Sequence, residues 1–282
     1  MKISIIIPTF NNVEALKQSV TLLEKASIIG LAEVLIVDNG STDGTDLVVS
    51  RQSSVISQYI KLKHNYGFTR AINEGAKKAK GKYLLFLNND CFVEKDTIAS
   101  LYAFLEKNNN YVATQPIIQT QQGDVESIGY MVDLKKGKAE VVQDEDRILD
   151  WILRQAQDDK VSMWNTGQVY GLSATCLLIR KDIFMKVGMF DESFHSYLED
   201  VDLFIRLAGS GYKYAPCIDV HVTHEHRATS KKMGAYKERH DMTNWIRIIL
   251  KNYPQSFIFR HFLSLFIERL RNISGLMKAL LS

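Results

Sequence analysis

The sequence has few cysteines and no long uninterrupted apolar segment. Its 282 residues include three scattered cysteines, Cys91, Cys176 and Cys217, whose spacing fits no metal-binding motif. We therefore expect buried free thiols in a reducing compartment. No segment reaches the ~20 apolar residues that a membrane-spanning helix needs. The N-terminus lacks the three regions of a signal peptide, so the chain is expected to stay in the cytoplasm.

Two phosphate-binding motifs are also absent. No Gly-x-Gly-x-x-Gly follows the first apolar run, and no Gly-Lys-Ser/Thr loop occurs. Their absence argues against dinucleotide oxidoreductases and P-loop enzymes. The formal net charge is only +3, so the overall charge does not indicate a nucleic acid partner. The length suits one large domain or two small ones.

The first hundred residues alternate between strand-like and helix-like patterns. Continuous apolar runs predict strands buried on both faces, because a half-exposed strand would alternate apolar and polar residues. These runs lie at residues 3–8, 32–37, 58–62 and 83–87, and helical periodicity marks residues 13–26 and 68–79. The alternation predicts an α/β fold with a mostly parallel sheet and right-handed crossovers.

Polar residues end three of these predicted strands. Residues 8–10, 38–45 and 88–90 follow the first, second and fourth strands. The C-terminal ends of parallel strands share one edge, where open α/β sheets bind ligands, so Asp38, Asp43 and Asp90 are expected in one cleft. Oxygen ligands of this kind suit Mg²⁺ or Mn²⁺ and, through the cation, a diphosphate. Asn-Asn-Asp at residues 88–90 is alternatively ordinary turn chemistry.

Four segments, in order and spacing, resemble family 2 inverting glycosyltransferases. They are SIIIPTFNN at residues 4–12, VLIVDNGSTDGT at 34–45, NYGFTRAINEG at 65–75 and LFLNND at 85–90; VGMFDE at 187–192 and YLEDVDL at 197–203 continue the pattern. Asn-Asn-Asp in place of the family's commonest Asp-x-Asp resembles the rhamnosyltransferase-like branch. The resemblance implies a GT-A type fold, in which a Rossmann-like nucleotide-sugar-binding half, residues 1–115, precedes an acceptor-binding half, residues 116–230.

The resemblance also implies a set of nucleotide-binding residues. Asp38 would bond the uracil or thymine ring, Arg70 would contact base or phosphate, and Asp43 fits the site or the scaffold of its loop equally well. Arg70 is alternatively a solvated helix residue. The other implied positions are Pro8 and Thr9 at the nucleotide, Asn65 and Gly67 in the loop under the base, and Asn88 and Asn89 beside the diphosphate.

Catalytic and metal-binding roles follow from the same resemblance. Asp90 would bind Mn²⁺ or Mg²⁺, although Asn88 is a weaker ligand than the usual carboxylate. Asp200 would be the general base, with Glu199 orienting the acceptor or the helix; helix capping is the alternative for these acids. A histidine after the strand near residue 220 would complete the metal or diphosphate site, with His224 preferred and His221 and His226 as alternates.

The second half has a different pattern. Residues 111–119 read as a strand, 128–142 as a hairpin turning at 135–138, and 144–160 as an exposed helix or loop. Residues 168–179 are again apolar, and 181–187 read as a short helix. Trp164 and Tyr170 are placed either to stack on an acceptor sugar or in the core.

The C-terminal residues 231–282 predict two helices, at 233–253 and 256–281. The second is amphipathic, so residues 255–282 suit either a membrane surface or packing against the domain or a second subunit, as in a homodimer.

The function implied is inverting transfer of a sugar from a UDP- or dTDP-sugar to a hydroxyl of a saccharide or lipid-linked acceptor. That role belongs to cell-surface polysaccharide synthesis, with the enzyme at the inner face of the membrane. Two alternatives stay open. A sugar nucleotidyltransferase commonly has a glycine- and basic-rich loop after its first strand, which is missing here. A catalytically silent nucleotide-sugar-binding module is disfavoured by the presence of Asp38, Asp90 and Asp200 together.

Overall fold

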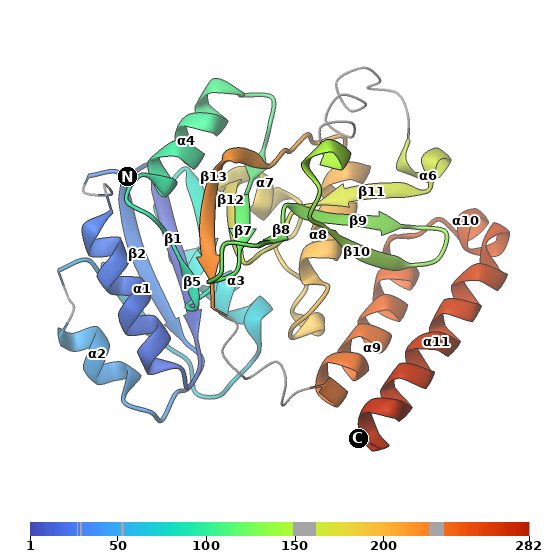
Figure 1. The fold of residues 1–282 in the computed structure, drawn as a ribbon, viewed down its shortest axis with the longest axis horizontal. Helices are drawn as coiled ribbons and strands as arrows, with labels where there is room; N and C mark the ends of the chain where they lie inside the picture. The colour runs from blue at the N-terminus through green and yellow to red at the C-terminus, as the bar shows by residue number, and fades with distance from the viewer. Residues whose placement is uncertain (27, 29, 52–53, 149–161, 226–233, 282) are drawn as a thin grey trace.

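The computed structural model describes residues 1–281 except 27, 29, 52–53, 149–161 and 226–233 (Figure 1). At its centre is a six-stranded sheet in the order β3-β2-β1-β4-β12-β6. The four strands predicted from apolar runs are confirmed and run parallel: β1 (Ile3–Thr9), β2 (Ala32–Asp38), β3 (Gln58–Lys61) and β4 (Tyr83–Leu87). The α/β fold class is confirmed with them.

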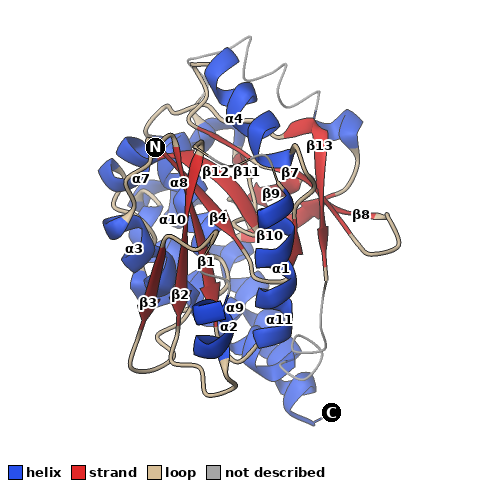
Figure 2. Ribbon diagram, turned by 90° about the vertical axis from the view of Figure 1, so that its left-hand side faces the viewer, coloured by secondary structure: helices blue, strands red, loops and turns tan. Residues whose placement is uncertain are grey.

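Both faces of this sheet are buried, which explains why its strands are continuously apolar. Ile6 and Leu84 point into one hydrophobic cluster, and Ile5 and Leu85 point into another. The helices α3 (Phe68–Lys78) and α1 (Val13–Lys25) cover opposite faces (Figure 2). The remaining helices around the sheet are α2 (Thr45–Arg51), α4 (Thr97–Lys107) and α7 (Lys181–Lys186).

The second half of the chain adds strands to the central sheet. β12 (Cys176–Arg180) pairs antiparallel with both β4 and β6 (Ala113–Thr114). The apolar segment 168–179 contains two strands, β11 (Gln168–Gly171) and β12, which belong to different sheets. Leu172 and Ala174 are buried in the link between them, so the apolar pattern hides the turn.

Two smaller sheets flank the central one. The predicted hairpin is confirmed as β9 (Gly129–Asp133) and β10 (Lys138–Val142), which form a sheet with β11. A four-stranded sheet has the order β5-β13-β7-β8. Its strands are β5 (Cys91–Phe92), β13 (Cys217–His224), β7 (Pro116–Gln119) and β8 (Val125–Ser127). The predicted strand at 111–119 thus divides into β6 and β7, and most of segment 144–160 lies outside the described residues.

The C-terminal helices α9 (Gly234–Asn252) and α11 (Phe262–Leu281) lie side by side at one end of the molecule (Figure 1). The predicted single helix at 256–281 is wrong, because α10 (Gln255–Arg260) ends at His261 before α11 begins. Phe257 fixes α10 by packing against Trp164, a tertiary contact with no sequence signal. No helix in the described part of the chain is long and apolar enough to cross a membrane.

Candidate active site

The turn after β4 is the centre of the candidate site. The backbone N–H of Asn88 donates to the backbone carbonyl of Thr175 at 2.9 Å, and the backbone N–H of Cys91 donates to the backbone carbonyl of Asn88 at 3.0 Å. These bonds hold the chain in a turn, as Asn-Asn-Asp chemistry allows. They leave the buried Oδ1 of Asn88 without a hydrogen-bond partner among the described residues. A polar atom of this kind is costly unless something else satisfies it.

Strand pairing brings His224 to Asp90. His224 on β13 pairs with Cys91 on β5, and its Nε2 lies 3.4 Å from Oδ1 of Asp90. Its Nδ1 lies 3.0 Å from Oε1 of Glu126 on β8. Burial alone would lower the pKa of His224, but the hydrogen bonds with Asp90 and Glu126 raise it to about 9. Of the alternates, His221 pairs with the exposed Glu94, and His226 lies outside the described residues.

The residues around Asp90 fit a cation that arrives with its substrate. Within the described ranges, no group of three or more His, Cys, Asp or Glu side chains could hold a metal by itself. Mg²⁺ commonly takes one or two protein carboxylates and completes its shell with substrate phosphates and water. Asp90 is 23% exposed and so can supply one such carboxylate, with His224 beside it.

Asp200 lies close to the same end of β4. It occupies the first turn of α8 (Glu199–Gly209), where its Oδ2 accepts from the Ala174 amide at 3.3 Å and its Oδ1 from the Val201 amide at 2.8 Å. The neighbouring Thr175 is bonded to Asn88, so two consecutive residues link Asp200 to the turn that carries Asp90.

Burial controls the charge of both acids at the start of α8. It raises the pKa of Asp200 to about 6, although the amide hydrogen bonds from Ala174 and Val201 oppose the shift. Burial, followed by the charge of Asp200, raises the pKa of Glu199 to about 8. Asp200 is thus mainly ionised at neutral pH and Glu199 mainly protonated, and two adjacent carboxyls have different states.

The third acid of this run has a structural role. Asp202 is fully buried and accepts from Arg206 Nε at 2.9 Å, Lys251 Nζ at 3.0 Å and Asn252 Nδ2 at 2.9 Å. These bonds tie α8 to α9. Asp202 therefore has a structural role in this run, and the catalytic roles of Asp200 and Glu199 stay predictions.

The loop after β2 is held largely by its own carboxylates. Asp38, the predicted base ligand, is fully buried and accepts from the Ser41 amide at 2.8 Å and from Tyr59 Oη at 2.6 Å. Its base contact remains a prediction, and any such contact must share these oxygens. Asp43 accepts from the Val13 amide at 2.9 Å and Thr45 Oγ1 at 2.6 Å, so it fixes the starts of α1 and α2. Of the two roles left open for Asp43, these bonds give the scaffold.

The predicted nucleotide loops meet at the end of β1. Thr9 Oγ1 accepts from Asn89 Nδ2 at 3.0 Å, which places both residues, and Pro8 before them, at the rim. Asn65 Oδ1 accepts from the Gly67 amide at 3.0 Å and so shapes its loop as expected. Gly67 has φ 88°, and a Cβ there would collide with the His195 carbonyl.

Arg70 sits at the edge of that loop. Its guanidinium lies 4.2 Å from the centroid of the Tyr66 ring, and its Nε lies 3.9 Å from Oε2 of Glu192. The side chain is 44% exposed, so it is partly held and partly open to a ligand.

Comparison with known proteins agrees with this arrangement. Residues 4–188 match the model of glycosyl transferase family 2, which is well over half of the chain. The chain belongs to glycosyltransferase family 2.

Two relatives of this family 2 chain align over most of its length. An uncharacterised glycosyltransferase of Bacillus subtilis, YfnE, is 25% identical over 263 residues, covering 82% of the chain and 67% of the relative. The N-acetylglucosaminyl-diphospho-decaprenol L-rhamnosyltransferase of Mycobacterium tuberculosis is 27% identical over 229 residues, covering 76% and 73%. Other relatives are much longer, and the chain spans 18% of the O-antigen biosynthesis protein RfbC of Myxococcus xanthus.

Solved structures show that the family 2 chain has the GT-A fold. The mannosyltransferase of Pyrobaculum calidifontis, in complex with GDP-Man and Mn²⁺, has a TM-score of 0.65 at 15% identity and covers 99% of the chain and 72% of its own. GalNAc-T7 with UDP, GalNAc and Mn²⁺ has a TM-score of 0.67 at 16% identity, and the match covers 93% of the chain and 54% of GalNAc-T7.

The two aromatic residues considered for sugar stacking are packed within the glycosyltransferase. Tyr170 is fully buried, and its hydroxyl donates to the Ile128 carbonyl. The Trp164 ring lies 5.2 Å from Tyr253 and 5.1 Å from Phe257, measured between centroids. The structure therefore supports the core alternative for both.

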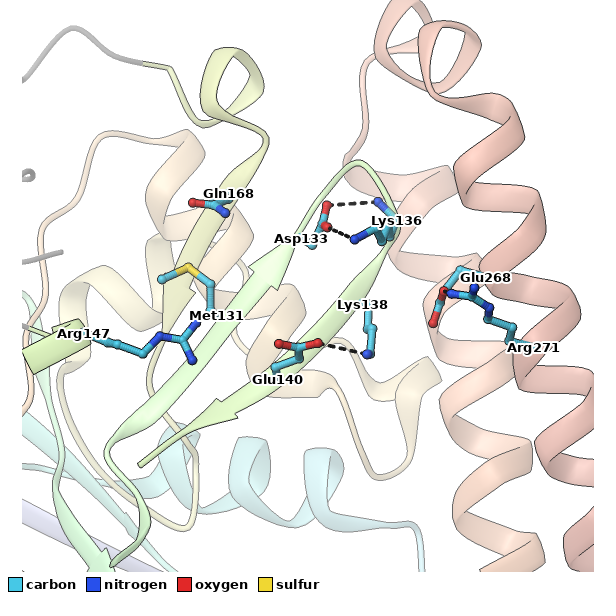
Figure 3. Close-up of a pocket in the computed structure, with 9 residues that line it drawn as sticks. All are labelled: Met131, Asp133, Lys136, Lys138, Glu140, Arg147, Gln168, Glu268 and Arg271. Atoms are coloured by element: carbon cyan, nitrogen blue, oxygen red, sulfur yellow. Dashed lines mark hydrogen bonds and ion pairs between the residues drawn. The ribbon is translucent and has the colours of Figure 1, made fainter. Parts of the chain in front are cut away.

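One pocket of the glycosyltransferase lies away from these residues. It has a volume of about 190 Å³ and lies between the hairpin of β9 and β10 and α11 (Figure 3). Charged side chains that line this pocket form ion pairs with one another: Lys136 lies 3.1 Å from Asp133, and Lys138 lies 2.9 Å from Glu140. None of the predicted site residues lines it, so we assign the candidate site to the strand ends.

Asn244 of α9 is a site residue that sequence reasoning missed. Its buried Nδ2 donates to three carbonyls, of Phe194 at 3.2 Å, Ser196 at 3.0 Å and Tyr197 at 2.8 Å. The segment 195–198 contains three residues with positive φ, His195, Tyr197 and Leu198, and leads directly into Glu199. The Asn244 side chain therefore stabilises the strained segment 195–198 that precedes Asp200.

Asn244→Ala is expected to lower both stability and turnover. Three carbonyls lose their donor, at a cost of about 1 kcal/mol for each lost bond, so the free energy of unfolding falls by about 2–3 kcal/mol. We also expect kcat to fall with KM for the donor unchanged, because Asp200 loses its fixed position. The control is Thr243→Ala, whose hydroxyl bonds only carbonyls of its own helix. If kcat is equal in the two variants at a temperature where both are folded, Asn244 does not position Asp200.

Proposed function

We propose that the chain is an inverting glycosyltransferase that uses a UDP- or dTDP-sugar and a hydroxyl acceptor. The observation that carries the proposal is Asp200, a half-buried carboxylate linked through Ala174 and Thr175 to the turn that carries Asp90. A base on one side and a diphosphate-binding carboxylate on the other are the groups that direct displacement at an anomeric carbon requires.

In the proposed reaction, Asp200 accepts the proton of the acceptor hydroxyl while that oxygen attacks the anomeric carbon. The bond from the anomeric carbon to the acceptor oxygen forms as the bond to the diphosphate oxygen breaks, which inverts the configuration. Asp90, with His224 in its neutral form after loss of its proton, would hold Mn²⁺ or Mg²⁺, whose charge stabilises the leaving diphosphate when the ion is bound. Thr9, Asn65, Gly67 and Arg70 would orient the nucleotide, and Glu199 the acceptor.

The comparisons support the substrate class. The two solved structures contain nucleotides or nucleotide sugars with Mn²⁺, and one relative is named as a rhamnosyltransferase acting on a diphospho-decaprenol-linked sugar. We therefore propose a saccharide or polyprenyl-linked acceptor and a role in cell-surface polysaccharide synthesis.

The test is a thermal-shift panel of nucleotides and nucleotide sugars with and without Mn²⁺. A ligand that binds only the folded protein adds about 2.7 kcal/mol at 100 times its Kd, so UDP or dTDP and their sugars are expected to raise Tm clearly in the presence of Mn²⁺. A Tm that responds only to nucleoside triphosphates would instead favour a sugar nucleotidyltransferase. Binding without hydrolysis or transfer of any sugar would favour the silent binding module.

A further inference from the structure

The outer side of the C-terminal helices carries half of the exposed large hydrophobic side chains in the described part of the chain. They range from 43% exposed for Ile273 to 88% for Phe259. We call them the apolar face: Phe259, Phe262, Leu263, Phe266, Leu270, Ile273, Met277 and Leu280. From Leu263 onward, those on α11 recur at intervals of three and four residues, so they form one stripe along the helix. A continuous exposed apolar surface on a folded protein marks an interaction site.

The opposite side of α11 already has its partners. Leu265 is buried, and Arg269 lies 5.4 Å from the centroid of the Trp245 ring on α9. Arg269 Nη2 also donates to the Gly137 carbonyl at 2.6 Å, and Ser264 Oγ donates to the Lys135 carbonyl at 2.6 Å. The helix is thus anchored to α9 and to the β9–β10 turn, and the apolar face remains uncovered.

The charges beside the apolar face are predominantly positive. Arg260, Arg271 and Lys278 are exposed, whereas the single acidic residue of segment 255–282 is Glu268. Glu268 is nearly buried and is bonded by Arg271 at 2.9 Å. Of the charges that this segment presents to solvent, the cations therefore dominate.

We propose that the apolar face binds the surface of an anionic membrane, with α11 lying in the plane of the interface. An amphipathic helix with one apolar side and flanking cations has this preference, and the helix is not one that could span the bilayer. The C-terminal end of α11 lies at the same end of the molecule as the C-terminal ends of β1 and β2 (Figures 1 and 2). Membrane binding would therefore keep the candidate site close to the lipid.

A second copy of the chain fits this face less well. In a two-fold interface the same surface meets itself, so a stripe with cations along its edge faces another such stripe. Arg260 and Lys278 would then lie against the same cations of the other copy, and like charges disfavour association. Anionic lipid headgroups complement these residues.

The experiment is co-sedimentation of the full chain with phosphatidylcholine vesicles, either pure or containing phosphatidylglycerol. Wild type is expected to bind the anionic vesicles, and Phe266→Asp/Leu270→Asp to lower that partition by at least about 100-fold. The control is Leu47→Asp, an equally polar change at a 59% exposed leucine on α2, which is expected to bind like wild type.

A charge variant supplies a second, independent measurement should the double aspartate variant fail to fold. Arg260→Glu/Lys278→Glu is expected to lower binding to anionic vesicles by at least about fivefold for each residue, and to leave binding to neutral vesicles unchanged. The proposal is overturned if the wild-type protein does not bind anionic vesicles, or if the charge-reversed variant binds them as well as the wild type does. A wild-type dimer that the aspartate variant converts to monomer, without vesicle binding, assigns the face to a second copy instead. These outcomes do not depend on whether the chain transfers a sugar.

Discussion

Asp200→Asn is expected to lower kcat for sugar transfer by about 10²–10⁴-fold, the usual contribution of a general base. Asparagine has the same shape and keeps an oxygen for the Ala174 and Val201 amides, so the fold and the donor site should survive. Donor binding, measured by thermal shift, is therefore expected to match wild type. Asp182→Asn, an exposed carboxylate paired with Arg180, is the control for removing a charge. Near-normal turnover in Asp200→Asn would refute the assignment.

The pH profile gives the same prediction a second readout. A general base acts in its ionised form, and burial raises the pKa of Asp200 to about 6. Activity in kcat/KM is therefore expected to be full above this pH and to fall tenfold per unit below it. Glu199→Gln is expected to leave activity near neutral pH unchanged. Glutamine resembles the protonated carboxyl, which is the form that the raised pKa of Glu199, about 8, favours there. A flat wild-type profile down to pH 5 contradicts a base with this pKa.

Asp90→Asn is expected to remove the Mn²⁺-dependent part of donor binding and to lower transfer by about 10²-fold or more. The carboxylate is the one charged oxygen ligand that the turn after β4 offers, and charge stabilisation of a leaving diphosphate contributes several kcal/mol. The measurement is the Tm shift by a UDP- or dTDP-sugar, titrated with Mn²⁺, alongside kcat.

Two comparison variants sharpen this result. Glu94→Gln removes a nearby exposed carboxylate that pairs with His221 and should leave the Mn²⁺ response unchanged. Asn88→Asp introduces a second carboxylate in place of the unpartnered amide oxygen and is expected to tighten Mn²⁺ binding. Unaltered Mn²⁺ dependence in Asp90→Asn would place the cation elsewhere.

The sequence predicted those parts of the fold that local patterns determine. The strands of the first half were found because both faces are buried and polar residues end each run, as at Leu87 and Asn88. Errors arose where tertiary contacts override local pattern. Leu172 and Ala174 are as buried as the strands on either side of them, so burial continues across the link between β11 and β12 although Ser173 and Thr175 are polar. The break at His261 has no proline or glycine to mark it.

The candidate site was predictable only in part. The resemblance selected Asp90, Asp200 and His224, and the structure brings His224 to Asp90 through the pairing of β13 with β5. Glu126 reaches the same histidine from β8, an edge strand that no motif marks. Asn244 bonds the segment that leads to Asp200, although it lies 47 residues after Tyr197 in the sequence. These bonds depend on how α9 packs.

The most direct test of the account is the crystal structure of the protein with Mn²⁺ and a UDP- or dTDP-sugar, with the ion located by anomalous scattering. We predict Mn²⁺ at about 2.1 Å from the Asp90 carboxylate, between it and the diphosphate. The Asp200 carboxylate should face the anomeric carbon from the opposite side, with room for an acceptor hydroxyl within about 3 Å of it. A nucleotide bound away from the end of β4, or an Asp200 side chain with no access to the sugar, would contradict the account.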